Sequence, residues 1–253
     1  MSKYILECCI DSVESAIAAQ AGGANRLEMC GNLIIGGTTP SLSLYEETRK
    51  HTDIKIHALL RPRFGDFLYT DYEMDMLKDE VKMFREAGAD GVVIGCLDQD
   101  GNLNMKQMES LLAERGNMSV TLHRAFDVCN DPFKALEQCK ELGINTILTS
   151  GQKNNVLDGA DLIRQLVEKA EGKVDILAGA GVNAGVIKKM LPMMPIHSFH
   201  MSGKVTLDSG MKYRKEGVSM GLPSLSEFEV FRTKAEYVKE AHDVLESWFD
   251  KVI

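Results

Sequence analysis

The sequence has few cysteines and no long apolar run. Six cysteines among 253 residues are too sparse for the disulfide scaffold of a small secreted protein. No apolar run approaches the roughly 18–20 residues of a membrane-spanning helix, so we expect no membrane partner. Met1 and Ser2 lead directly into a predicted strand, so we also expect no signal peptide. These absences predict a cytoplasmic protein whose cysteines remain free thiols.

Positive charge is also in short supply. The chain carries 29 lysines and arginines against 37 aspartates and glutamates, for a formal net charge of -8. Like charges do not form blocks, which argues against a nucleic-acid groove. A local basic pocket for a small anionic molecule is still compatible with this balance. Hydrophobic residues make up 44% of the chain, enough to fill a sizeable core.

Short apolar strands alternate with amphipathic helices along the chain. The predicted strands cover about residues 4–9, 26–30, 54–60, 91–95, 118–123, 145–149, 174–178 and 197–201. The predicted helices cover about 11–21, 43–50, 71–87, 104–115, 132–142, 159–170 and 183–190, and a last helical stretch fills much of 226–250. This alternation predicts an α/β fold, a TIM-type (β/α)8 barrel forming a single domain over residues 1–253. A doubly wound sheet is the alternative, but no Gly-x-Gly-x-x-Gly motif follows the first strand.

One long irregular segment interrupts the pattern at about residues 202–225. Loops of that length are uncommon unless they are functional or mobile. The segment follows the last predicted strand and is rich in basic side chains, namely Lys204, Lys212, Arg214 and Lys215. We therefore expect it to form a lid over an anionic ligand.

Two stretches near the start of the chain read almost alike, LECC at 6–9 and LEMC at 27–30. Each ends a predicted strand, where side chains two positions apart share a face. The carboxylate and the last thiol of each stretch should therefore project together into the barrel, Glu7 with Cys9 and Glu28 with Cys30. The outward positions of the first three strands are apolar, as packing against helices requires: Leu6, Leu27, Met29, Ile56, Ala58 and Leu60.

Polar side chains gather at the C-terminal ends of the predicted strands, where the active site of such a barrel lies. Buried charges are costly unless they are paired or bound to metal. The convergence of this many ionisable groups therefore indicates a functional site. We expect Arg26 and Arg61 to pair with Glu7 and Glu28. The alternative is a structural ring of ion pairs that seals the barrel mouth.

Several long motifs, in order along the chain, carry a family resemblance. They are ECCIDSVESA, GGANRLEMC, GGTTPS, RPRFGDFLY, TLHRAFD, ILTSG and MKYRKEGVSMG. From about residue 5 to 221 the chain resembles the CutC copper homeostasis family. The resemblance implies a cytoplasmic TIM barrel, a homo-oligomer, and a role in copper handling. It also marks Cys9 and Cys30 as candidate ligands for Cu(I), which soft thiolates select.

The two thiols also have a simpler interpretation. Adjacent strands lie about 4.8 Å apart, so two sulfurs on neighbouring strand ends can share one ion. However, neighbouring barrel strands contribute side chains to alternate layers, which would offset Cys9 from Cys30. A buried cysteine that binds no metal behaves as a small hydrophobic residue. Metal binding and barrel filling therefore both remain open.

The residues themselves favour a second hypothesis, an enzyme acting on a small phosphorylated or carboxylated metabolite. Proton transfer would fall to carboxylates and a histidine, with candidates Glu7, Glu28, His123 and Asp127. Arginines and glycine-rich loop amides would hold the anion, with candidates Arg26, His57, Arg61, Asp66, Arg124, Ser150, Gly151, Gly179, Gly181, Ser202 and Gly203. A binding scaffold without chemistry is a third possibility.

Overall fold

The computed structural model describes residues 3–221 and 226–251. Its eight parallel strands pair in sequence order and close into a barrel, β8 pairing with β1. The strands are β1 (Ile5–Ile10), β2 (Arg26–Met29), β3 (Lys55–Leu59), β4 (Gly91–Ile94), β5 (Ser119–Leu122), β6 (Thr146–Thr149), β7 (Asp175–Ala178) and β8 (Ser198–Met201). The predicted (β/α)8 barrel is thus confirmed, and the open-sheet alternative is wrong.

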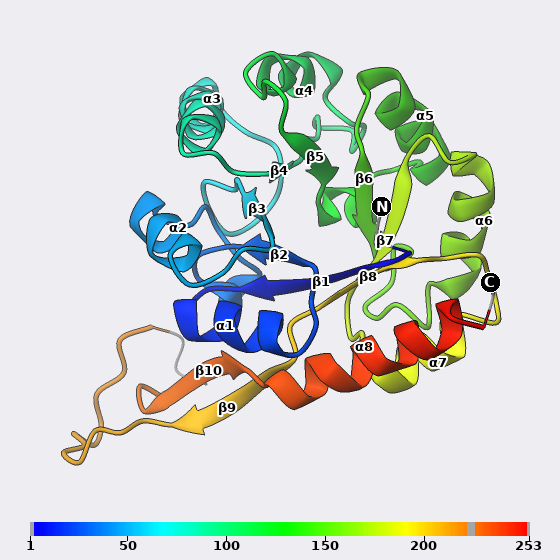
Figure 1. Cartoon of the computed structure of the whole chain (residues 1–253). Helices are drawn as coiled ribbons and strands as arrows, with labels where there is room; N and C mark the ends of the chain where they lie inside the picture. Colours follow the sequence, from blue (N-terminus) through cyan, green and yellow to red (C-terminus); the bar gives the residue numbers. More distant parts are fainter. Residues whose placement is uncertain (1–2, 222–225, 252–253) are drawn as a thin grey trace.

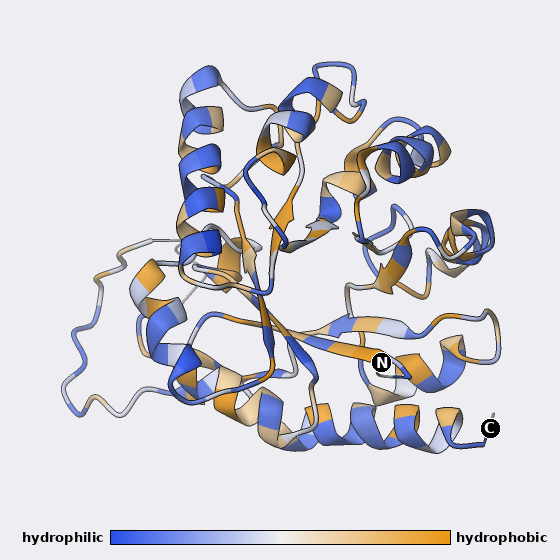
Figure 2. Ribbon diagram, turned by 45° about the horizontal axis from the view of Figure 1, so that its top comes forward, coloured by the Kyte–Doolittle hydropathy of each residue, from blue (hydrophilic) through white to orange (hydrophobic). Residues whose placement is uncertain are grey.

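A helix follows each strand and covers the outside of the barrel (Figure 1). The α-helices are α1 (Val13–Ala21), α2 (Leu42–Arg49), α3 (Asp71–Glu86), α4 (Met105–Leu112), α5 (Pro132–Leu142), α6 (Ala160–Ala170), α7 (Ala184–Met190) and α8 (Ala235–Phe249). Two 3-10 turns, Leu33–Ile35 and Arg124–Val128, follow strands β2 and β5. Figure 2 shows hydrophilic residues along the outer helix faces and hydrophobic residues on the strands.

The helices begin and end where local chemistry predicts. Thr70 caps α3 in a capping box with Glu73, so that each side chain accepts a backbone N–H of the other. Asp131 caps α5 just before Pro132, and Gly143 ends that helix with φ of 66°, a conformation in which glycine has no side chain to clash. Such signals explain why the helix boundaries are close to the predicted ones.

The barrel strands present two different faces. Their outward residues belong to the core between strands and helices, including all six predicted outward positions and Cys8, which is fully buried there. The inner face carries polar residues at positions that most barrels fill with branched apolar side chains. The register sets Glu7 opposite Arg26 and His200, and Cys9 opposite Glu28. Polar side chains from β1, β2 and β8 therefore meet inside the barrel.

The segment after β8 differs from its prediction. β9 (Lys204–Asp208) and β10 (Glu229–Thr233) form an antiparallel hairpin that projects outside the barrel beside α1 (Figure 1). Of the helical stretch predicted within residues 226–250, α8 forms the part from Ala235 to Phe249, whereas Glu229–Thr233 is the strand β10. The spacing of Phe228 and Phe231 resembles a helical one, but pairing of Val230 with Leu207 decides the local structure.

The predicted lid is also not observed over the mouth. Arg214 pairs with Asp208 at 2.7 Å and lies over the Phe228 ring, and Lys204 lies over the Phe231 ring. These charges are engaged inside the hairpin and its connecting loop. Residues 222–225 of the predicted lid lie outside the described residues.

Candidate functional site

A cavity of about 270 Å³ opens at the C-terminal ends of the barrel strands. Its walls combine apolar side chains with a small number of ionisable ones, the usual composition of a small-ligand site. The polar lining residues are Cys9, Glu28, Arg61, His123, Arg124, His200 and Ser202, together with the backbone of Gly36 and Gly181. Seven residues predicted for the site, all but His200 and Gly36 of these, therefore lie around one space.

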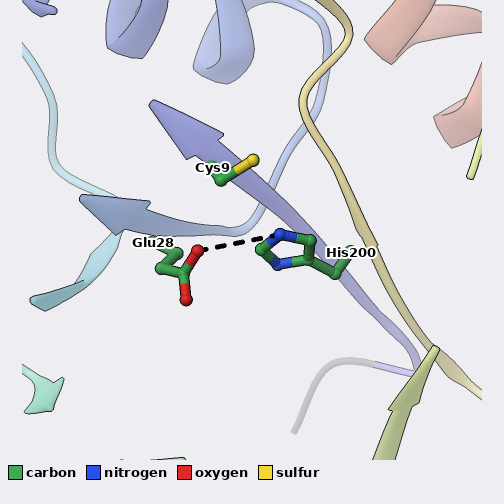
Figure 3. Close-up of side chains that lie close together, drawn as sticks. All are labelled: Cys9, Glu28 and His200. Atoms are coloured by element: carbon green, nitrogen blue, oxygen red, sulfur yellow. Dashed lines mark ion pairs between the residues drawn. The ribbon is translucent and has the colours of Figure 1, made fainter. Parts of the chain in front are cut away.

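Three of these side chains point toward one another in the barrel interior (Figure 3). Cys9 comes from β1, Glu28 from β2 and His200 from β8, and one ligand atom of each lies within 4.8 Å of the other two. The carboxylate of Glu28 is 3.7 Å from Nε2 of His200. Cys9 and Glu28 are 7% and 6% exposed, so water competes little for these groups. A thiol, a carboxylate and an imidazole at this spacing form a potential metal site.

His200 is fixed on its other side by Glu7. Its Nδ1 donates to Oε1 of Glu7 over 2.7 Å, which leaves Nε2 facing Glu28. Burial works against a charged ring, but Cys9, Glu28 and the hydrogen bond to Glu7 outweigh it and raise the pKa of His200 well above its ordinary value. A proton and a metal ion would therefore compete for Nε2 of His200.

Glu7 completes the chain of contacts with an ion pair to Nε of Arg26. Burial alone would raise the pKa of Glu7, but the charges of Arg26 and His200 hold it well below its usual range. The predicted pairing of Glu7 with Arg26 is confirmed. Glu7 is 1% exposed, so it acts as a fixed negative charge that orients His200.

Glu28 is in a different electrostatic position. Burial raises the pKa of Glu28 to about 7, although the neighbouring His200 charge opposes the change. A carboxyl group with a pKa near neutrality can both donate and accept a proton. The two glutamates of the doubled motif therefore have opposite properties, although the sequence places them alike.

Cys30 does not belong to the three-residue group. It lies two positions beyond Glu28, and its Sγ is 3.5 Å from the carbonyl oxygen of Ile10. Leu59 and Val93 surround it in a small apolar cluster. Burial raises the pKa of the Cys30 thiol well above its ordinary range. These surroundings favour the neutral thiol over the thiolate that binds metal.

Arg61 and His123 form the opposite wall of the cavity. Arg61 donates to the carbonyl oxygens of Gly37 (3.1 Å) and Gly65 (2.7 Å). The predicted pairing of Arg61 with a glutamate is therefore wrong. Loop carbonyls accept from its two Nη atoms, and its Nε is buried without a hydrogen-bond partner among the described residues. Burial lowers the pKa of His123 to about 3, and the Arg61 charge adds to this effect. Nε2 of His123 is buried without a hydrogen-bond partner among the described residues.

Arg124 is positioned by Asp127 and Ser150. Its Nε donates to Asp127 over 2.6 Å and its Nη2 to Oγ of Ser150 over 2.9 Å. Asp127 also accepts from Thr149 and from the backbone N–H of Gln152. Asp127 and Ser150 thus hold the loop after β6 and aim the guanidinium of Arg124 at the cavity.

The other predicted residues lie elsewhere. Asp66 is exposed and pairs with Arg63 at 2.9 Å. Gly151 and Gly179 support the turns after β6 and β7, and Gly203 lies against Val238 of α8. None of these four lines the mouth cavity. Arg26 and His57 line a second cavity, at the N-terminal ends of the strands.

His200 is the functional candidate that the sequence reasoning missed. The alternation of side chains along β8 could have identified it. Phe199 and Met201 are apolar outward residues, so His200 between them must face into the barrel. Its role depends on the closure of the barrel, since β8 meets β1 only when the sheet closes.

The sequence of the chain is similar to a known protein family. The model of the CutC family matches residues 4–205. The chain belongs to the CutC family. A CutC family protein from Bacteroides fragilis is 43% identical over 98% of this chain and 98% of its own length. A human protein named as a copper homeostasis protein cutC homolog is 39% identical over 93% of this chain and 87% of its own.

A solved structure shows the same CutC fold. The CutC protein from Streptococcus agalactiae superposes with a TM-score of 0.75 at 27% identity. The match covers 79% of this chain and 98% of the streptococcal one. The family match of this chain ends at residue 205, so most of the β9–β10 hairpin and all of α8 lie beyond it.

Within the described residues, the helices are too short or too polar to cross a membrane.

Proposed function

We propose that this CutC-family protein binds copper as cargo at the barrel mouth, through Cys9 and His200, with Glu28 as a third group. The observation that carries the proposal is the three-residue group itself, with its ligand atoms within 4.8 Å of one another. The name of the human relative supports copper as the metal.

The donor set fits copper chemistry. Thiolate and imidazole are ligands that copper accepts, and soft thiolate favours Cu(I). Metal-bound histidines usually donate their second ring N–H to a carboxylate, as Nδ1 of His200 does to Glu7. Glu28 is a harder ligand, so we assign it a supporting role in balancing the charge. Metal binding would displace the proton on His200.

Cu(I) titration under reducing conditions, in competition with a chromophoric chelator, tests this proposal. Cys9→Ser and His200→Gln should each weaken Cu(I) binding about a hundredfold or more, since losing an outer partner alone costs about 10–100-fold. Cys139→Ser is the matched control, because it removes a buried thiol of α5 from outside the cavity. Unchanged stoichiometry and affinity in both site variants would contradict the proposal.

Cys30 supplies the sharpest comparison within this experiment. If the ion lies between Cys9 and His200, Cys30→Ser keeps the affinity of the wild type. If the two cysteines share the ion, Cys30→Ser loses as much affinity as Cys9→Ser. The pattern across the two serine variants therefore decides which ligand set holds the metal.

One observation favours a second function, acid–base catalysis on a small anionic metabolite. Glu28, with its pKa raised to about 7 mainly by burial, faces a cavity whose walls carry Arg61 and Arg124. The arginines would hold a phosphate or carboxylate group, while Glu28 exchanges a proton with the bound molecule.

A screen of phosphorylated and carboxylated metabolites for turnover tests this second function. Glu28→Gln should abolish turnover and leave binding intact, whereas Arg124→Ala should mainly raise KM. Glu109→Gln is the matched control, because it changes an α4 carboxylate outside the cavity. Turnover that survives in Glu28→Gln would remove this candidate.

A further inference from the structure

The barrel has a second cavity, of about 710 Å³, at its N-terminal end. Several strands contribute their first residues to its lining, as Lys55 does for β3 and Ser119 for β5. The remaining lining residues are mostly polar: Asn25, Arg26, His57, Asp90, Arg115, Asn117, Asn145, Thr146 and Asp175. None of the residues around the mouth cavity takes part. We call this space the base cavity.

Two deeply buried side chains of the base cavity have unused nitrogen atoms. Arg26 is 6% exposed and His57 is 2% exposed. Nη2 of Arg26 and Nδ1 of His57 have no hydrogen-bond partner among the described residues. An unpaired buried polar atom costs about 1–3 kcal/mol, so such atoms normally have a partner in water or in a ligand.

Two positively charged side chains at the rim of the base cavity, Lys55 and Arg115, have no ion-pair partner among the described residues. Within the same part of the chain, the side chain of Arg115 donates only to the carbonyl oxygen of Gly143. The two lining carboxylates are already engaged elsewhere. Asp90 pairs with Arg49 at 2.8 Å, and Asp175 accepts from Ser198 and lies 3.2 Å from His197.

We propose that the base cavity binds a small molecule carrying a phosphate or carboxylate group, held by Lys55 and Arg115 at the rim and by Arg26 and His57 inside. Arginine and lysine are the usual partners of such anions. The unpaired nitrogen of Arg26 supplies a donor deep in the cavity. His57 supplies a neutral ring, because burial lowers its pKa to about 4.

A series of side-chain contacts connects the base cavity with the mouth. Arg26 lines the base cavity and pairs with Glu7, and Glu7 accepts from His200 at the mouth. Arg26 contacts Glu7 through its Nε, so its unpaired Nη2 stays available to an anion at the base. Arg26 is therefore the residue through which the base cavity is connected to the mouth.

The test is a titration with inorganic phosphate and, separately, with acetate at low ionic strength, followed by calorimetry and by NMR of the histidine rings. We expect saturable binding of at least one anion, with the His57 ring signals shifting during the titration. The variant Lys55→Ala/Arg115→Ala should bind at least fivefold more weakly. The control Lys106→Ala/Lys188→Ala removes the same charge from exposed helix positions outside the cavity and should bind like the wild type.

The outcomes separate the two ends of the barrel. Binding of phosphate without acetate assigns a phosphate ligand, and the reverse assigns a carboxylate. No saturable binding of either anion to the wild type overturns the proposal. Binding that Arg124→Ala weakens and Lys55→Ala/Arg115→Ala does not also overturns it, because the anion then lies at the mouth. Because the His57 signals are read in the wild type, the binding result stands even if a variant fails to fold, and the test requires no metal.

Discussion

The two ends of the barrel use similar residues for different purposes. The mouth encloses 270 Å³ and places a thiol, a carboxylate and an imidazole together. The base encloses 710 Å³ and is lined by cations and amides, with two carboxylates, Asp90 and Asp175, that already have partners. Each end holds a neutral histidine, His123 or His57, whose pKa burial lowers. The mouth can therefore hold a cation and the base an anion, and the Glu7–Arg26 pair separates the two.

The largest expected change in the free energy of unfolding comes from breaking the Glu7–Arg26 ion pair. Glu7→Gln leaves Arg26 buried without a charge partner, and breaking a buried pair in this way costs about 3–5 kcal/mol. Urea unfolding measures the loss. The double variant Glu7→Gln/Arg26→Met should recover part of it, since the unpaired charge is gone. A loss below about 1 kcal/mol in Glu7→Gln would show that the pair does not support the barrel.

Two glycines give a matched comparison between the ends. A Cβ on Gly91 would lie 2.7 Å from the His57 ring and 2.7 Å from the carbonyl oxygen of Ser119. The three atoms nearest to a Cβ on Gly95 all belong to side chains, with the His123 ring at 2.6 Å. Side chains can move more easily than the backbone of a closed barrel. We expect Gly91→Ala to cost up to about 3 kcal/mol, the usual range for overpacking, and Gly95→Ala clearly less.

Gly210→Ala is the control for this comparison, because nothing lies within 4 Å of its added Cβ. Thermal unfolding of the three variants measures the order. If Gly95→Ala proves more costly than Gly91→Ala, the mouth is packed more rigidly than the base, contrary to this account.

The buried histidines predict how stability depends on pH. His123 has a folded pKa of about 3 and titrates near 6.5 when unfolded, so only the unfolded chain takes up its proton between pH 7 and 5. Its contribution is present above pH 6.5 and is lost as the pH falls. The loss over that range is about 2 kcal/mol. Urea unfolding at both pH values should therefore show a smaller acid loss in His123→Gln, and equal losses would mean that His123 is charged in the fold.

The smallest effect is expected at Asp66, outside both cavities. Its ion pair with Arg63 is exposed, and such pairs contribute about 0–1 kcal/mol. Asp66→Asn should change the free energy of unfolding by less than about 1 kcal/mol. It should leave the affinities for Cu(I) and for phosphate as in the wild type. Weakened binding of either ligand would return Asp66 to the functional site.

Local patterns of the sequence predicted most of the fold. Apolar alternation and helix caps such as Thr70 act within a few residues, so the strands and helices of the barrel were placed closely. The β9–β10 hairpin was missed because it depends on pairing between Lys204 and Thr233, far apart in the chain. The ligand set of the site could not be predicted in the same way, because it depends on the register between strands. Cys9 lies opposite Glu28 and not opposite Cys30, and no pattern within one strand reveals that.

X-ray absorption spectroscopy of the protein loaded with one equivalent of Cu(I) tests the central claim most directly. The account predicts one sulfur ligand together with histidine nitrogen, and loss of the histidine signal in His200→Gln. A copper ion bound by two sulfurs, with a spectrum that His200→Gln does not change, would contradict it and assign the ion to Cys9 and Cys30.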